Sequence, residues 1–265
     1  MSADFPPTWH YGLVADWWAE FNTRGPEIDA YGRIVKAGQP ALDAGCGAGR
    51  LLLPWLRRGY DVDGCDVSPD MIARCRERAA RERLEPTLFV QPLHELDPPR
   101  SYRTIVACGV LGLGSTRAQD EEALRRFHRS LEPGGILVLD NETPYASARR
   151  WPLWTREGRA DLPEPWPEPS GRRRAADGAE YELRTRAVDL DPLDQTLRFE
   201  LRAEKWRDGE QVGAESHGLA MRMYFRDELL LLLERAGFSE IEVQGGYDGT
   251  EPSADDDVLV YLARV

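Results

Sequence analysis

The feature that most constrains this 265-residue chain is a glycine-rich stretch, Ala41–Arg50, with the sequence ALDAGCGAGR. Its first four residues predict a short buried strand that ends at Gly45, and a helix is expected to begin near Gly49. Glycine at alternate positions leaves the turn without side chains, so a ligand can lie directly against the backbone. The unpaired N–H groups and the positive end of the helix dipole then face that ligand. The stretch therefore predicts a ligand site at a strand–turn–helix junction.

The spacing of these glycines narrows the class of ligand. A dinucleotide-binding turn has its glycines in the pattern G-x-G-x-x-G, whereas this turn reads G-x-G-x-G and continues with Arg50. An NAD-dependent oxidoreductase is therefore the weaker alternative within this kind of fold. With Leu42 and Asp43 before it, the turn resembles motif I of the class I S-adenosylmethionine (SAM)-dependent methyltransferases.

A second motif follows at the distance that an adenosine ligand requires. Residues 60–66 predict a strand that ends in Asp66, about twenty residues after the first glycine, where an acid can accept both ribose hydroxyls. Ser68 and Pro69 predict the N-cap and first turn of the next helix. The run from Asp66 to Met71 resembles the second motif of the same family, in which hydrophobic side chains flank the adenine. An ordinary βαβ unit is the alternative, and two motifs in register argue against it.

The resemblance implies SAM as the cofactor and S-adenosylhomocysteine (SAH) as the product. In the family, the third strand usually ends in an acid that bonds the adenine amino group, but here residues 88–90 are followed by Gln91. We expect Gln91 to bond the adenine edge instead, and Leu93 to cover the adenine face. The cofactor contacts that the resemblance implies are Asp43, Ala44, Gly45, Cys46, Gly47, Asp66, Val67, Met71, Gln91, Leu93, His94, Cys108, Gly109 and Val110.

Apolar segments that alternate with helices predict the rest of the fold. Residues 104–108 and 136–140 are almost wholly apolar, as the strands of a parallel sheet covered on both faces require. A helix over 120–131 and the sequence Leu-Glu-Pro-Gly-Gly separate them, which also resembles the methyltransferase pattern. The last two strands, at 241–244 and 258–263, are expected to form a reversed hairpin. We therefore expect an α/β fold with a Rossmann-like, doubly wound, mostly parallel seven-stranded sheet whose seventh strand is antiparallel.

An insertion follows the fifth strand. Residues 144–180 contain many prolines and arginines, three tryptophans and no helical period. Three strand-like segments come next, and their alternation of apolar and charged residues predicts an antiparallel three-stranded sheet with one apolar face: 181–190, 195–206 and 216–225. Such a cap resembles that of small-molecule methyltransferases, including glycine and amino-sugar N-methyltransferases.

The chain is thus expected to have three parts. An N-terminal helical lid is predicted over residues 1–38, and its helices precede the first strand. The SAM-binding methyltransferase core is predicted over 39–143 and 221–265. The substrate-binding β cap is predicted over 144–220.

Candidate residues for the transfer itself come from the lid, the end of the fifth strand and the cap. Methyl transfer from a sulfonium is an in-line displacement, in which the protein aligns the acceptor and excludes water. A general base is needed only when the acceptor arrives protonated, and the candidates are His10, Tyr11, Glu142 and His217. The aromatic candidates for binding the acceptor are Trp9, Trp18, Tyr145 and Trp151. The alternative is that these histidines are structural and that the aromatic residues only pack the first helix onto the sheet.

Composition limits the partners. The formal net charge is −12 and the sequence pI is near 4.9, which argues against nucleic acid and anionic membranes as ligands. We therefore expect a small-molecule acceptor that receives the methyl group on a nitrogen or an oxygen. No signal peptide or membrane-spanning apolar run is visible, and the four cysteines lack metal-type spacing, so reduced thiols, a cytoplasmic location and no bound metal are expected. A homodimer is left open, and so is a SAM-binding regulatory protein that has lost turnover.

Overall fold

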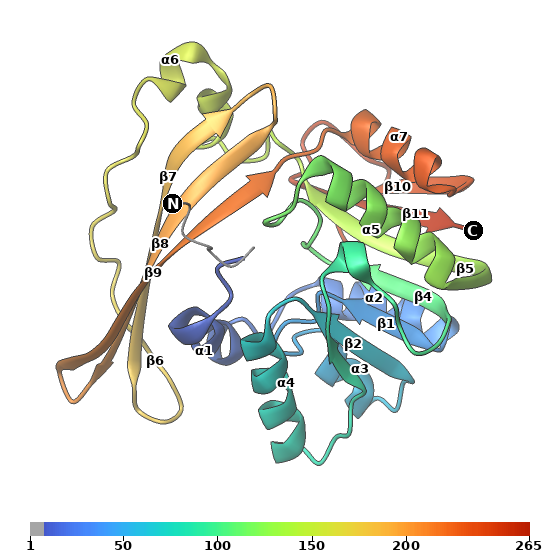
Figure 1. Cartoon of the computed structure of the whole chain (residues 1–265), viewed down its shortest axis with the longest axis horizontal. Helices are drawn as coiled ribbons and strands as arrows, with labels where there is room; N and C mark the ends of the chain where they lie inside the picture. The colour runs from blue at the N-terminus through green and yellow to red at the C-terminus, as the bar shows by residue number, and fades with distance from the viewer. Residues whose placement is uncertain (1–7) are drawn as a thin grey trace.

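The computed structural model describes residues 8–265, which form a large and a small sheet with helices around them (Figure 1). The large sheet has seven strands in the order β10-β11-β5-β4-β1-β2-β3. Its strands are β1 (Ala41–Ala44), β2 (Val62–Asp66), β3 (Leu88–Val90), β4 (Tyr102–Ala107), β5 (Leu131–Glu142), β10 (Glu240–Gly245) and β11 (Val258–Arg264). All pairings are parallel except those of β11, which is antiparallel to both β5 and β10. The predicted doubly wound, mostly parallel seven-stranded sheet is confirmed.

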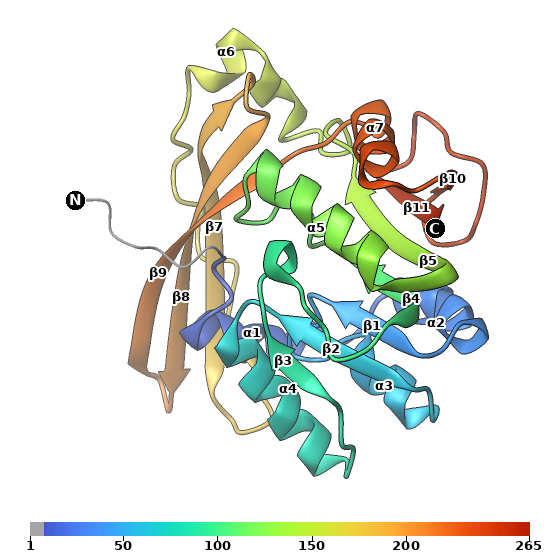
Figure 2. The same ribbon diagram turned by 45° about the vertical axis from the view of Figure 1, so that its right-hand side comes forward.

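Helices cover both faces of this sheet (Figure 2). On one face lie α2 (Glu27–Ala37), α3 (Leu52–Arg57) and α4 (Pro69–Arg81), and on the other lie α5 (Arg117–Ser130) and α7 (Arg226–Ala236). Neighbouring residues of a strand point to opposite faces. Accordingly, Val106 and Val138 pack in the cluster with α2 and α3, whereas Ile105 and Leu137 pack with α5 and α7. Burial on both faces explains why these strands are almost wholly apolar.

The helix ends follow the capping signals in the sequence. The Ser68 side chain accepts a hydrogen bond from Met71 N at 3.2 Å, and Pro69 occupies the first turn of α4. Thr116 and Gln119 form a capping box at the start of α5. Gly237, with φ +110°, ends α7 in the left-handed conformation that favours glycine.

The small sheet is the predicted cap, and it has four strands rather than three. They are β6 (Arg173–Arg174), β7 (Glu180–Asp191), β8 (Thr196–Arg207) and β9 (Glu210–Arg222), all antiparallel. The extra strand, β6, is only two residues long, so no alternation pattern marks it in the sequence. Two short helical turns, η2 (Trp151–Trp154) and α6 (Arg156–Arg159), precede it.

Two predicted strand starts are corrected by turn and pairing geometry. β9 begins at Glu210 rather than at 216, because Asp208 and Gly209 both have positive φ and make a two-residue hairpin loop from which pairing starts at once. β5 begins at Leu131 rather than at 136, because Leu131 pairs with Tyr102 before a break in register.

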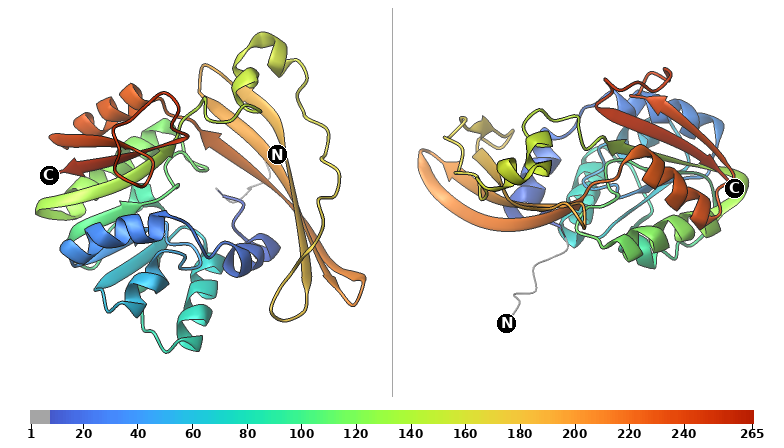
Figure 3. Two further views of the ribbon diagram at one scale, coloured as in Figure 1. Left: turned by 180° about the vertical axis from the view of Figure 1, so that it is seen from behind. Right: turned by 90° about the horizontal axis from the view of Figure 1, so that it is seen from above.

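The cap sheet stands beside the carboxyl ends of the large sheet, with α1 (Gly12–Phe21) between the cap and α4 (Figures 1 and 3). Its apolar face is directed inward, since Leu197, Leu201 and Ala203 are buried. On its charged face Arg198 pairs with Asp189 at 2.8 Å. The predicted alternation of the cap strands is confirmed.

The end of β9 joins the cap to the core. Gly114 N donates to the Ala220 carbonyl, and Arg222 N donates to the Gly112 carbonyl, each at 2.8 Å. The cap sheet therefore extends through Arg222, beyond the predicted boundary at residue 220, and is fixed to the loop that follows β4. Of the predicted lid, residues 1–7 lie outside the described residues. No helix among residues 8–265 is both long and apolar enough to cross a membrane.

Candidate functional site

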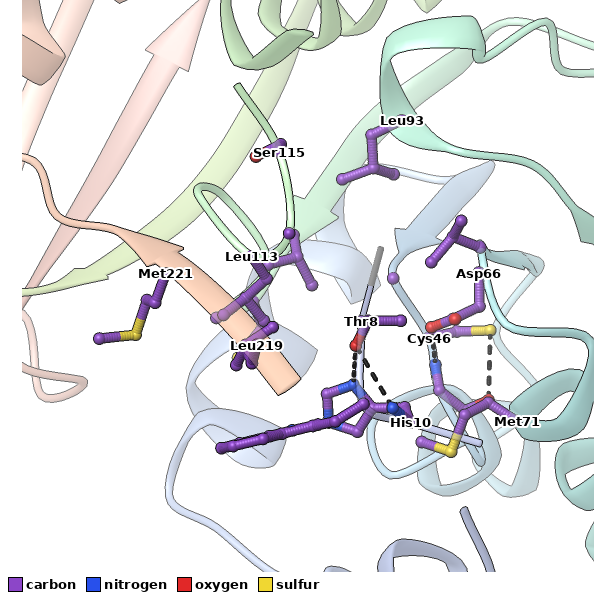
Figure 4. Close-up of a pocket in the computed structure, with 18 of the residues that line it drawn as sticks. Thr8, His10, Cys46, Asp66, Met71, Leu93, Leu113, Ser115, Leu219 and Met221 are labelled. Atoms are coloured by element: carbon purple, nitrogen blue, oxygen red, sulfur yellow. Dashed lines mark hydrogen bonds between the residues drawn. The ribbon is translucent and has the colours of Figure 1, made fainter. Parts of the chain in front are cut away.

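A cavity of about 440 Å³ lies where the carboxyl ends of β1, β2, β4 and β5 meet the inner face of the cap. Figure 4 shows Cys46 and Asp66 from the core on one side of it, and Leu219 and Met221 of β9 on the other. Ligands in open α/β sheets bind at this edge of the sheet. The cavity therefore joins the predicted cofactor turn and the predicted cap in one site.

The glycine turn has the geometry that the sequence predicts. Gly45 has φ +83° and Gly47 has φ +52°, conformations that L side chains rarely adopt. A Cβ atom on Gly47 would also lie 2.9 Å from Met71 Cε, and one on Gly45 would overlap Val110. Gly45 N and Cys46 N both donate to the Cys65 carbonyl at 2.8 Å, which fixes the turn to β2. The backbone of the turn thus lies bare toward the cavity.

Asp66 ties the turn to the second motif. One carboxylate oxygen accepts from Gly47 N at 2.9 Å and the other accepts from Ser68 N at 2.8 Å. Burial raises the pKa of Asp66 above its ordinary value, and the backbone N–H donors oppose that rise. A carboxylate held this way retains lone pairs toward the cavity, where hydroxyl donors of a ligand can reach them.

Asp43 lies beneath the turn at the end of β1. It is buried, and one of its carboxylate oxygens accepts from Leu52 N at 3.1 Å. Burial raises the pKa of Asp43 to about 7, since it disfavours the charged form, and Asp66 adds to the effect. Asp43 therefore titrates close to neutral pH, beside a site that is predicted to take a cation.

Four of the five residues predicted on the adenine side line the cavity. Val67, Met71, Leu93 and His94 line the cavity. Gln91 does not, because its side-chain oxygen accepts from Asp97 N at 3.1 Å and caps the loop after β3; the prediction that it bonds adenine is corrected.

A glutamine of α5 does line the cavity. Gln119 lines the cavity, with Nε2 3.2 Å from His94 Nε2. Only its capping-box position marks it in the sequence. Ala44 is fully buried within β1 and does not line the cavity, which corrects its prediction as a contact.

The far end of the cofactor side is formed by Cys108, Gly109 and Val110, all of which line the cavity as predicted. Arg50, the residue that replaces the third glycine of a dinucleotide turn, lines it too. It forms an ion pair with the buried Glu27 of α2, and its Nη2 lies 3.6 Å from Cys108 Sγ. A cation therefore lies next to the turn, held by Glu27 of α2.

On the acceptor side, three predicted residues from the N-terminal segment line the cavity. They are Trp9, His10 and Trp18. The His10 ring stacks on Trp18 with centroids 5.5 Å apart, and its Nδ1 lies 2.5 Å from Thr8 Oγ1. Burial lowers the pKa of His10 to about 4, so the ring is neutral at pH 7.

Glu142, at the end of β5, also lines the cavity as predicted. Its carboxylate accepts from Arg150 Nη1 at 2.9 Å, and the Arg150 guanidinium carbon lies 5.5 Å from the ring centroid of Phe199. A second ion pair, Glu142–Arg150, thus lies against an aromatic ring of the cap.

Four predicted acceptor-side residues lie outside the cavity, which corrects their assignment: Tyr11, Tyr145, Trp151 and His217. His217 shares its face of β9 with Leu219 and Met221, but at that point the strand passes α1, and His217 Nε2 pairs with Glu215 at 3.1 Å. Glu215 in turn accepts from Leu13 N at 2.9 Å. Alternation alone does not reveal where along a strand the cavity ends.

The other three outliers have similar local reasons. Tyr11 is the N-cap residue of α1, close enough to Asp66 and Asp70 that both raise its pKa, after burial. Tyr145 and Trp151 are exposed and pack edge-to-face with centroids 6.3 Å apart. They form a surface pair on the segment between β5 and the cap.

Sequence reasoning missed a further set of cavity residues. The cap contributes Arg150, Thr185, Phe199, Leu219 and Met221, and the rest of the chain contributes Thr8, Asn22, Ala48, Arg50, Leu51, Pro92, Leu113, Gly114, Ser115, Gln119, Asp120 and Ala123. The inward parity of Phe199 on β8 was the one signal that could have found such a residue. No group of three or more His, Cys, Asp or Glu side chains among residues 8–265 could hold a metal ion.

Comparison with known proteins identifies the turn and the sheet. Residues 41–135 match the family model described as a methyltransferase domain. A ubiquinone biosynthesis O-methyltransferase of Xanthomonas euvesicatoria is 31% identical over 121 residues, which are 44% of this chain and 49% of that protein. The chain thus spans about half the length of this relative.

Solved structures resemble the whole chain. The CcbJ methyltransferase of Streptomyces caelestis has a TM-score of 0.70 at 21% identity, over 98% of both chains. SAM-bound CalS10, an amino pentose methyltransferase of Micromonospora echinaspora, has a TM-score of 0.61 at 19% identity, over 96% of this chain and 98% of its own.

The predicted resemblance to the methyltransferases is confirmed by these matches, and CalS10 is a structure with SAM bound. The glycine turn and Asp66 both fall within the matched region. Residues 41–135 therefore match a methyltransferase domain, and the whole chain has the fold of solved methyltransferases.

Proposed function

We propose that this chain transfers the methyl group of SAM to a nitrogen or oxygen atom of a small molecule enclosed between the glycine turn and the cap. The observation that carries the proposal is the single cavity bordered both by the turn with Asp66 and by the inner face of β7–β9. A cofactor on the turn and an acceptor under the cap would share this space, as an in-line displacement requires.

The residues present fit SAM. The bare backbone of the turn gives room that a Cβ atom on Gly47 would fill, and Asp66 offers a carboxylate to ribose hydroxyls. Met71 and Leu93 supply apolar contact for the adenine, and Cys108 to Val110 border the methionine end. When bound, SAM supplies a methyl group already activated by the sulfonium, so the task of the protein is to bind, orient and exclude water.

The acceptor side is mostly apolar with few polar groups. Trp9, Trp18, Phe199 and Met221 supply aromatic and apolar surface, and the Glu142–Arg150 pair supplies the charges. Such a lining suits a ring-sized acceptor with an amino or hydroxyl group. The amino pentose methyltransferase among the structural neighbours supports amino sugars as the first acceptor class to test.

SAM binding is expected to release protons near neutral pH. Burial raises the pKa of Asp43 to about 7, so part of the Asp43 population is protonated there, and a bound cation lowers that pKa and expels the proton. Calorimetry in buffers of different ionisation enthalpy measures the release, and Asp43→Asn should abolish it. A binding enthalpy that is the same in every buffer would contradict the expectation.

His10 is proposed as the proton acceptor for the reacting group. His10→Gln should lower kcat by about 10- to 100-fold, a modest loss because a ring with a pKa of about 4 is a weak base. Since the ring is neutral above that pH, activity should not fall through its protonation between pH 8 and 5. His217→Gln, outside the cavity, is the matched control and should keep the wild-type rate. Equal rates for the two variants would remove His10 from the reaction.

Incubation with SAM carrying a labelled methyl group tests the proposed reaction. The acceptors to be tested are amino sugars, small amines and small alcohols. Mass spectrometry then identifies the methylated products. We expect the label on a nitrogen or oxygen of one acceptor class. Binding of SAM without transfer to any member would instead identify a SAM-binding protein without turnover.

A further inference from the structure

Asp140, near the end of β5, is a buried acid to which the sequence analysis gives no role. Its side chain is 5% exposed. It accepts hydrogen bonds from Tyr31 Oη at 2.8 Å, Tyr247 Oη at 3.0 Å and Cys108 Sγ at 3.0 Å, and also from Gly109 N. Four donors from α2, from the β10–β11 connection and from the segment after β4 thus converge on one carboxylate.

An acid is not required at this position for β5 to pack in the sheet. The preceding residues of β5, Val138 and Leu139, are buried apolar side chains that pack against the helices. A carboxylate in the same setting is costly unless donors satisfy it. If one donor is removed, the Asp140 carboxylate keeps too few hydrogen bonds for a buried group. The donors and the acid therefore make one unit.

The unit reaches the cofactor side of the cavity. Gly109, with φ +62°, lines the cavity, and its N–H is held by Asp140. Val110, the next residue, fills the space beside Gly45 where a Cβ atom would lie. A shift of the segment after β4 would therefore move Val110 relative to Gly45 in the glycine turn.

A second link joins the same elements. Arg50 of the turn lies 3.6 Å from Cys108 Sγ and pairs with Glu27, and both Glu27 and Tyr31 belong to α2. α2 thus contacts the predicted cofactor side at two points, through Glu27 and Tyr31. Burial, and then Asp140, raise the pKa of Tyr31 and of Tyr247, so both hydroxyls stay protonated donors at any working pH.

We propose that Asp140 is a positioning residue for the cofactor: with Tyr31 and Tyr247 it fixes the Cys108–Val110 segment against α2 and the β10–β11 connection. The proposal rests on the proposed function, since it takes SAM as the ligand of this cavity.

The test compares SAH affinity with stability in the full chain. The variants are Asp140→Asn, Tyr31→Phe and Tyr247→Phe, each measured by calorimetric titration with SAH and by thermal unfolding. Tyr102→Phe is the matched control, because Tyr102 is as buried as Tyr31 and donates to the buried Asp63 at 2.9 Å, yet neither Tyr102 nor Asp63 lines the cavity.

We expect Asp140→Asn to weaken SAH binding by about tenfold or more, and each cavity-linked tyrosine variant by about three- to tenfold. Tyr102→Phe should lower Tm as the other tyrosine variants do but keep SAH affinity within about twofold. A purely structural role predicts no such separation between Kd and Tm.

The outcomes distinguish the two proposals. If the wild-type chain binds SAH and Tyr31→Phe and Tyr247→Phe bind it equally well, the positioning role is overturned while the proposed function stands. If the wild-type chain does not bind SAH, the proposed function itself fails. Should Asp140→Asn not fold, the two tyrosine variants decide, because they keep the carboxylate.

Discussion

Asp66→Ala is expected to weaken SAH binding by about 30- to 150-fold, or roughly 2–3 kcal/mol. The substitution removes the charged acceptor proposed for two ribose hydroxyls. It also leaves Gly47 N and Ser68 N without the partner that holds them at 2.9 and 2.8 Å, so the turn loses its link to the second motif. Calorimetric titration measures the effect, with circular dichroism to confirm that the variant is folded.

A second acid on the same strand provides the control. Asp63 is buried whereas Asp66 is partly exposed, and Asp63 bonds Arg100 and Tyr102 and does not line the cavity. Asp63→Ala should therefore lower stability and leave SAH affinity within about twofold. A folded Asp66→Ala variant with wild-type affinity would reduce Asp66 to a strand-end residue.

Substitutions on the inner face of the cap are expected to lower kcat/KM for the acceptor without changing the affinity for SAH. Phe199→Ala combined with Leu219→Ala removes apolar surface from β8 and β9 on the acceptor side. Without this surface the acceptor is held loosely and exposed to water. A misplacement of about 1 Å lowers the reaction rate about 100-fold. We therefore expect kcat/KM for the acceptor to fall about 100-fold while the Kd of SAH changes less than twofold.

The opposite face of β8 supplies the matched variant for this experiment. Arg198 neighbours Phe199 but is exposed and pairs with Asp189. Arg198→Ala should keep both kcat/KM and SAH affinity, since exposed ion pairs contribute little. If the double variant weakened SAH binding as much as turnover, the cap would belong to the cofactor site and not to the acceptor site.

What the sequence predicts well here is local. The glycine turn, the Ser68 cap and the alternation of β8 depend on residues close together in the chain, and the structure has them where the pattern indicates. The apolar strands likewise follow from burial on both faces.

The sequence does not predict which side chains of distant elements line the cavity. Gln119 lines it from α5 whereas Gln91 bonds its own loop. Asp140 finds Tyr31 and Tyr247 at sequence separations of 109 and 107 residues. His217 lies on the inward face of β9 but pairs with Glu215 beside α1, outside the cavity. Such choices are made by packing between elements, which no local pattern records.

The most direct test of the central claim is a calorimetric titration of the wild-type chain with SAH and, separately, with NAD. The turn with G-x-G-x-G spacing and Asp66 at the end of β2 predict one SAH site per chain with a Kd in the micromolar range, about −8 kcal/mol. They also predict that NAD neither binds nor competes. Tight binding of NAD with no binding of SAH would contradict the account.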